Sequence, residues 1–161
     1  RGRFGASLAT VDGALVVGAP AWSGGQGAVV VYDDVPRFPG TAVPVARFTN
    51  PRAEPEHFGK HVAVGDLDAD GLWDLWVGAP DRRAIDATND ARSRYDIGWG
   101  WVWWGSGREG WSAVPAPAAD AELGGRQPFE RVGRATVLRD LDGDGRAEVL
   151  DPVRAPDPGT R

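Results

Sequence analysis

The 161-residue chain contains 42% hydrophobic and 25% charged residues, a composition typical of a folded globular protein. Its formal net charge of −5 and the scattered positions of its arginines argue against nucleic acid as a partner. Because the chain has no cysteine, disulfides and thiolate metal sites are excluded, and no apolar run is long enough to insert into a membrane. The 23 glycines and 13 prolines favour many turns over long helices.

One pattern occurs three times along the chain. Each pass starts with a residue followed by glycine, at Phe4, Phe58 and Val132. In the first two passes a short apolar run follows and ends in Gly-Ala-Pro, which begins at Gly18 and at Gly78. These runs are bounded by Gly, Pro and Asp and are too short for typical helices, so they predict β-strands. Runs that are apolar on both faces suit sheets covered on both sides, such as the blades of a β-propeller.

The first two passes differ at the turn that follows the opening strand. The first pass has Asp12-Gly13 between apolar runs, which predicts a two-residue β-hairpin with a primed turn. The second pass has a longer acidic segment at the same place, so we expect that segment to form a longer loop at the tip of the equivalent hairpin.

Farther along, residues 81–97 and 113–127 show little periodicity and are predicted to be exposed loops.

Two acidic segments, residues 66–74 and 140–148, share the pattern D-x-D-x-D-G-x-x, followed by Asp or Glu. Four carboxylates so close together repel one another unless a cation lies among them. Calcium accepts six to eight hard oxygen ligands in irregular geometry, whereas magnesium demands an octahedron and keeps its waters. The sequence therefore predicts two calcium sites, with the residue at position 7 contributing its carbonyl oxygen. The predicted ligands are Asp66, Asp68, Asp70, Leu72 and Asp74 in the first loop, and Asp140, Asp142, Asp144, Arg146 and Glu148 in the second.

Two other interpretations of these segments stay open. They could be solvated acidic turns without a metal. They could also be loops of the EF-hand type, which require a bidentate acidic residue at position 12. That position is Val77 in the first segment, which fails the test. In the second it is Asp151, which could ligate, although Pro152 opposes an exiting helix.

The order and spacing of these motifs resemble FG-GAP repeats, the unit of the integrin α-subunit β-propeller. Phe4-Gly5 with Gly18-Ala19-Pro20, and Phe58-Gly59 with Gly78-Ala79-Pro80, carry the resemblance. It implies four-stranded antiparallel blades, with calcium held in the hairpin between the first two strands of a blade. It also implies adhesion or ligand recognition instead of catalysis.

We therefore expect an all-β chain forming a partial propeller of about two and a half blades, as a single domain over residues 1–161. The repeats are expected at about 4–50, 58–112 and 132–161, the last incomplete. This third pass departs from the family because it has Val132 in place of Phe and lacks the Gly-Ala-Pro. Closed propellers of this family hold more blades, so the remaining blades or another chain are expected to complete the structure.

The tryptophan-rich run over residues 99–104 places Trp99, Trp101 and Trp103 on one side of a strand. Packing against a neighbouring blade is favoured over a stacking platform for sugar rings. The same packing role is predicted for Trp73 and Trp76.

No residue pattern singles out a catalytic group, and His57 and His61 would lie too far apart along a strand to share a metal.

The leading hypothesis is a calcium-binding propeller segment, extracellular or at the cell surface, that recognises a protein or a glycan. In this hypothesis calcium has a structural role and the chain has no enzymatic activity. One alternative is a structural subunit that completes a propeller with another chain. The other is a calcium-dependent enzyme, a hydrolase or lyase.

Overall fold

The computed structural model of the chain describes residues 2–32, 42–81, 96–105, 118–126, 130–134 and 136–152. Most of the predicted loop over 81–97 lies outside this part of the chain. Within the described residues the structure is all-β, with one short 3₁₀ segment, η1 (Trp22–Gly25). No helix among them is long and apolar enough to cross a membrane.

The first blade is a four-stranded antiparallel sheet whose strands follow one another in chain order. It consists of β1 (Ser7–Val11), β2 (Ala14–Ala19), β3 (Ala28–Tyr32) and β4 (Pro44–Thr49). Strand β3 is buried along nearly its whole length because its Ala-Val-Val-Val run is apolar on both faces. Strand β1 alternates between half-buried and exposed residues, which fits a strand with one face packed and the other face exposed to solvent.

The second blade repeats this arrangement. It consists of β5 (His61–Gly65), β6 (Asp74–Ala79), β7 (Trp99–Trp103) and β8 (Ala121–Gly124), again in sequential antiparallel order. The expectation of a loop throughout residues 113–127 is wrong at β8. This strand is short and has exposed residues at Glu122 and Leu123, so its sequence lacks the apolar run that marks the other strands.

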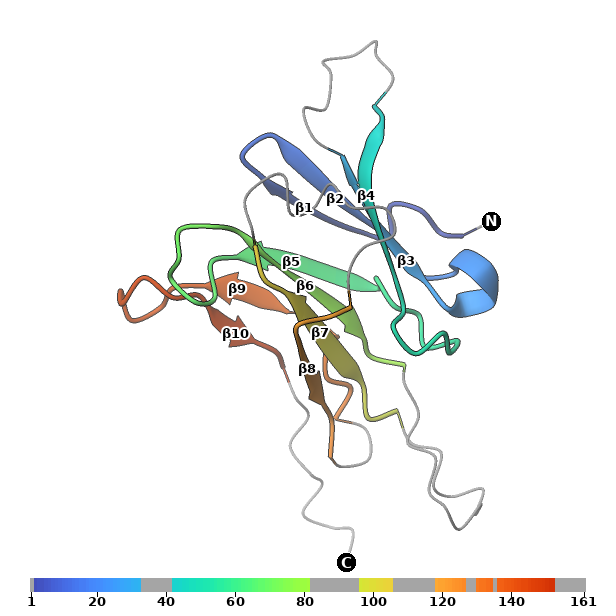
Figure 1. Cartoon of the computed structure of the whole chain (residues 1–161). Helices are drawn as coiled ribbons and strands as arrows, with labels where there is room; N and C mark the ends of the chain where they lie inside the picture. Colours follow the sequence, from blue (N-terminus) through green and yellow to red (C-terminus); the bar gives the residue numbers. More distant parts are fainter. Residues whose placement is uncertain are drawn as a thin grey trace, which may run out of the picture.

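The third unit is the antiparallel hairpin of β9 (Val137–Arg139) and β10 (Glu148–Leu150). It lies against β5, just as β5 lies against β1 of the first blade (Figure 1). It therefore corresponds to the first two strands of a further blade. The prediction of a partial propeller with about two and a half four-stranded blades is confirmed.

The core of the molecule lies between the first two blades. Phe48 from the first blade and Phe58, which precedes β5, contact Trp103 edge-to-face, with ring centroids 5.0 and 5.8 Å apart. Phe58 also contacts Trp101 at 5.4 Å. Trp101 and Trp103 are only 1% and 3% exposed, so the packing interpretation of the tryptophan strand is confirmed for them. Trp99 is half-buried, with the Arg52 guanidinium 4.8 Å from its ring centroid.

The other two tryptophans that were expected to pack behave differently from each other. Trp76 is buried on the opposite face of the second blade, in a cluster with Val102 and Val132 that faces the third unit. Trp73 is 41% exposed, and a core packing role for it is wrong. It belongs to the loop between β5 and β6, beyond the edge of the sheet.

The backbones of successive blades come into close contact at pairs of glycines. A Cβ atom on Gly18 would lie 2.0 Å from the carbonyl oxygen of Gly59, and one on Gly78 would lie 2.2 Å from that of Gly133. No side chain fits at such distances, so the glycine of Gly-Ala-Pro allows the next repeat to approach. Each joint is therefore formed by the end of β2 or β6 and the residue-glycine start of the following repeat.

A second contact at each joint shows that Val132 occupies the position in the third repeat that Phe58 occupies in the second. Parallel bridges pair Gly27 with Phe58 and Gly98 with Val132. Both bridged residues are buried, at 0% and 4% exposed. The third pass therefore starts at the same structural position as the second, although it lacks the aromatic ring.

We expect Gly18→Ala to lower the free energy of unfolding by about 1–3 kcal/mol, because the added methyl group overpacks the joint between the first two blades. Urea unfolding followed by tryptophan fluorescence measures the loss. Thr10→Ala is the control, an exposed substitution on the neighbouring strand that should change stability by no more than about 0.5 kcal/mol. Equal losses in the two variants would contradict the steric account.

Candidate metal centre

The two acidic segments close equivalent hairpins. Loop A, residues 66–74, joins β5 to β6, and loop B, residues 140–148, joins β9 to β10. Both project to the same side of the molecule as the tip between β1 and β2 (Figure 1). At that first tip Asp12 and Gly13 have φ values of 45° and 84°, so the predicted primed turn is confirmed.

Loop A brings three carboxylates together. Asp66, Asp68 and Asp70 each place an oxygen within 4.8 Å of the others. These carboxylates also hold the loop in shape, since Asp66 Oδ2 accepts the N–H of Gly71 at 3.0 Å and Asp70 Oδ1 accepts that of Leu72 at 2.7 Å. Asp66 Oδ1 is buried and has no hydrogen-bond partner in the structure. A buried anionic oxygen without a donor is costly, so this atom suits a cation as its neighbour.

Asp74, at position 9 of loop A, lies outside the three-carboxylate group and is fully buried. Its Oδ2 accepts the N–H of Leu67 at 2.6 Å, and its Oδ1 accepts that of Gly105 at 2.7 Å, beyond the end of β7. Burial raises the pKa of this carboxyl group above its usual value, the two backbone hydrogen bonds oppose that shift, and the negative charges of Asp68 and Asp70 add to it. Asp74 therefore anchors the base of loop A, and its role as a ligand stays a prediction.

Loop B repeats the backbone hydrogen bonds of loop A. Asp140 Oδ2 accepts the N–H of Gly145 at 3.0 Å, and Asp144 Oδ1 accepts that of Arg146 at 2.8 Å. Glu148 Oε2 accepts the N–H of Leu141 at 2.8 Å, the bond that Asp74 makes with Leu67. The longer Glu side chain therefore reproduces the anchoring contact.

The carboxylates that converge in loop B are Asp140, Asp142 and Glu148, again within 4.8 Å of one another. Asp144 lies outside this group. The group in loop A is formed by positions 1, 3 and 5 of the pattern, and the group in loop B by positions 1, 3 and 9. At position 7, Leu72 and Arg146 are located by the hydrogen bonds of their own N–H groups, and the ligand role of their carbonyl oxygens stays a prediction.

The EF-hand interpretation is wrong for both loops, because each closes a β-hairpin and no helix flanks either. Asp151, the candidate ligand at position 12, lies away from loop B. Its Oδ2 accepts hydrogen bonds from the backbone N–H of Gly133 and from the Thr136 hydroxyl, the latter at 3.0 Å.

The three hairpin tips are connected in a row. The Trp73 indole N–H in loop A donates to Asp12 Oδ2 at 2.6 Å, and the Ala147 N–H in loop B donates to the Asp66 carbonyl oxygen at 2.6 Å. Sequence reasoning assigned Asp12 only a turn and Trp73 only a core role. Alignment of the repeats could have revealed the first contact, because it puts Asp12 at the tip equivalent to loop A.

The fold and these loops define a segment of a β-propeller whose hairpin tips carry acidic clusters able to hold a divalent cation. No protein-family model matches the chain. The chain is similar to integrin alpha-IIb of Homo sapiens, at 34% identity over 158 residues that cover 96% of this chain and 13% of the integrin. This similarity supports an integrin-like relationship, and the chain spans a small part of the length of the curated relative that it matches.

With calcium removed by a chelator, we expect Asp74→Ala to lower the free energy of unfolding by about 2 kcal/mol or more, because two backbone N–H groups lose their acceptor. Asp70→Ala should change stability little under the same conditions, since that side chain is exposed and its removal relieves repulsion. Urea unfolding of both variants checks this. A neutral Asp74→Ala variant would show that position 9 does not anchor the loop.

Proposed function

We propose that this chain is a calcium-binding segment of an extracellular or cell-surface β-propeller for adhesion, in which calcium has a structural role. The observation that supports it most is the repeated loop. Two successive repeats place loops with the same hydrogen bonds at equivalent hairpin tips, and each gathers three carboxylates. The similarity to integrin alpha-IIb favours an adhesion protein over an enzyme.

The spacing of the carboxylate oxygens fits calcium. Two oxygens bound to one calcium ion at about 2.3–2.6 Å lie at most about 5 Å apart. The grouped oxygens of loops A and B lie within 4.8 Å of one another, and all are hard carboxylate donors. The full proposed ligand sets are Asp66, Asp68, Asp70, the Leu72 carbonyl and Asp74, and Asp140, Asp142, Asp144, the Arg146 carbonyl and Glu148.

Calcium in these loops would stiffen the row of hairpin tips. Loop A is bonded to the first tip through Trp73 and to loop B through Asp66, so an ion in loop A restrains residues of all three repeats. Extracellular calcium-binding modules have dissociation constants of about 10⁻⁴–10⁻³ M, and an affinity in this range would suit the proposed extracellular location. If calcium is present at a hundred times its dissociation constant, each site adds about 2.7 kcal/mol to the free energy of unfolding.

A protein is the favoured partner. Of the three tryptophan side chains that could have formed a sugar platform, Trp101 and Trp103 are buried between the blades, and Trp99 is half-buried beneath Arg52. We further propose that residues 1–161 act as one domain, with repeats at about 4–50, 58–112 and 132–161. The third repeat holds only a hairpin among the described residues, which favours completion by the remaining blades or by another chain.

Calorimetric titration of chelator-treated protein with calcium should reveal two binding sites. Asp70→Ala should abolish binding at loop A, and Asp144→Ala should abolish binding at loop B, because each removes a carboxylate from its loop. Each variant should keep the other site.

The control is Glu54→Gln, which removes an exposed acidic group outside both loops and should bind calcium as the parent does. The proposal fails if calcium releases no heat and does not raise the unfolding midpoint. It fails equally if Asp70→Ala and Asp144→Ala bind calcium as the parent does.

A further inference from the structure

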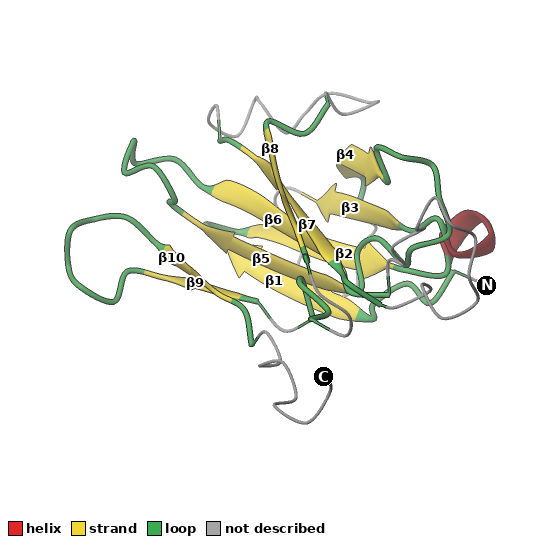
Figure 2. Ribbon diagram, turned by 90° about the horizontal axis from the view of Figure 1, so that it is seen from below, coloured by secondary structure: helices red, strands yellow, loops and turns green. Residues whose placement is uncertain are grey.

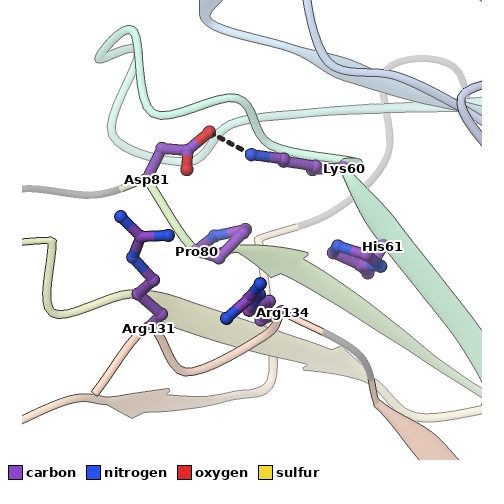
Figure 3. Close-up of a pocket in the computed structure, with 6 residues that line it drawn as sticks. All are labelled: Lys60, His61, Pro80, Asp81, Arg131 and Arg134. Carbon is purple, nitrogen blue, oxygen red and sulfur yellow. Dashed lines mark hydrogen bonds and ion pairs between the residues drawn. The ribbon is translucent and has the colours of Figure 1, made fainter. Parts of the chain in front are cut away.

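A pocket of about 380 Å³ lies beside β5 and β6, at their ends away from loop A. Lys60 and His61 are at the start of β5, and Pro80 and Asp81 follow β6, whereas loop A joins the other ends of these strands. Figure 3 shows Arg131 and Arg134 across the pocket from Lys60 and Asp81. The lining residues are Lys60, His61, Pro80, Asp81, Arg131 and Arg134.

The lining carries more positive than negative charge. Asp81 is the one carboxylate among the described lining residues, and it is shared, because its Oδ2 lies 2.6 Å from Lys60 Nζ and 3.0 Å from His57 Nδ1. Arg131 is held by Asp96 at 2.9 Å. Arg134 is exposed and forms no hydrogen bond or ion pair with any residue that the structure describes. The pocket therefore has a guanidinium group available to an incoming anion.

His61 provides a built-in reporter of charge in this pocket. Burial lowers the pKa of its imidazole, and the positive charges of Lys60 and Arg134 lower it further, while Asp151 and Asp81 act in the opposite direction. An anion bound beside Arg134 would raise this pKa, since a negative charge favours the imidazolium form.

We propose that this pocket binds one carboxylate group, presented by an acidic side chain of a protein partner. A guanidinium group offers a planar pair of donors that matches a carboxylate, which explains the role of Arg134. Long polyanions such as sulfated glycans are disfavoured, because the pocket is small and the whole chain carries a net charge of −5. The inference rests on the proposed recognition function and names the chemistry of its partner, but it requires no calcium.

The test uses the 161-residue chain and two small probes, the N-acetyl, N-methylamide derivatives of aspartate and asparagine. They differ only in whether the side chain carries a carboxylate. NMR titration should give saturable shifts around the pocket with the aspartate probe and none with the asparagine probe. The pKa of His61, followed through its imidazole resonances, should rise when the aspartate probe is saturating.

Arg134→Gln should weaken binding of the aspartate probe about tenfold, the effect of removing one charge-assisted contact. Arg47→Gln is the matched control, because Arg47 is an exposed arginine on β4, far from the pocket in the first blade, and it should leave binding unchanged. Both positions are exposed, so both variants should fold, and unchanged backbone spectra away from the substitution check this.

Three results would overturn the proposal: no saturable shift, equal binding of the asparagine probe, or tighter binding of a sulfated disaccharide than of the aspartate probe. Unchanged binding by Arg134→Gln would overturn it as well. The titration is repeated in a calcium chelator, where binding should persist. If calorimetry shows no calcium binding while the aspartate probe still binds, the calcium-dependent function fails and the carboxylate pocket stands.

Discussion

The structure depends on how closely one repeat can approach the next. At each joint the backbone of a residue-glycine start passes over the glycine of the preceding strand, at Gly18 with Gly59 and at Gly78 with Gly133. A single methyl group would not fit at either point. This contact sets the offset between blades, and it allows the apolar faces to meet over Phe58, Trp101 and Trp103.

The same offset gives the two ends of the blades different properties. At one end the hairpin tips are aligned closely enough that loop A bonds both the first tip and loop B. Figure 2 shows from a second direction that loops A and B project at the same end of the strands. Acidic groups gather there. At the other end the starts of two repeats bring basic side chains around Asp81, which gives a positive pocket in an acidic protein. One joint geometry therefore separates a candidate cation-binding end from a candidate anion-binding end.

Strands with a strong local signal were predicted well. The apolar runs of β2, β3 and β6, the Asp12-Gly13 turn and the acidic hairpin tips were all placed correctly from sequence. Strand β8 was missed because it is short and half-exposed at the outer edge, where only pairing with β7 makes it a strand. Trp73 was misjudged because hydrophobicity suggested burial, whereas its indole N–H bonds a neighbouring tip.

The sequence by itself determined the repeat, its β character and the two acidic clusters, because each depends on residues that are close together along the chain. In both loops the carboxylates at positions 1 and 3 converge, Asp66 with Asp68 and Asp140 with Asp142. Only the tertiary structure decided which tips touch, that Asp74 anchors its loop through Gly105, and that Arg134 shares a pocket with Lys60. Those contacts join different strands or repeats, and the packing of one blade on the next fixes them.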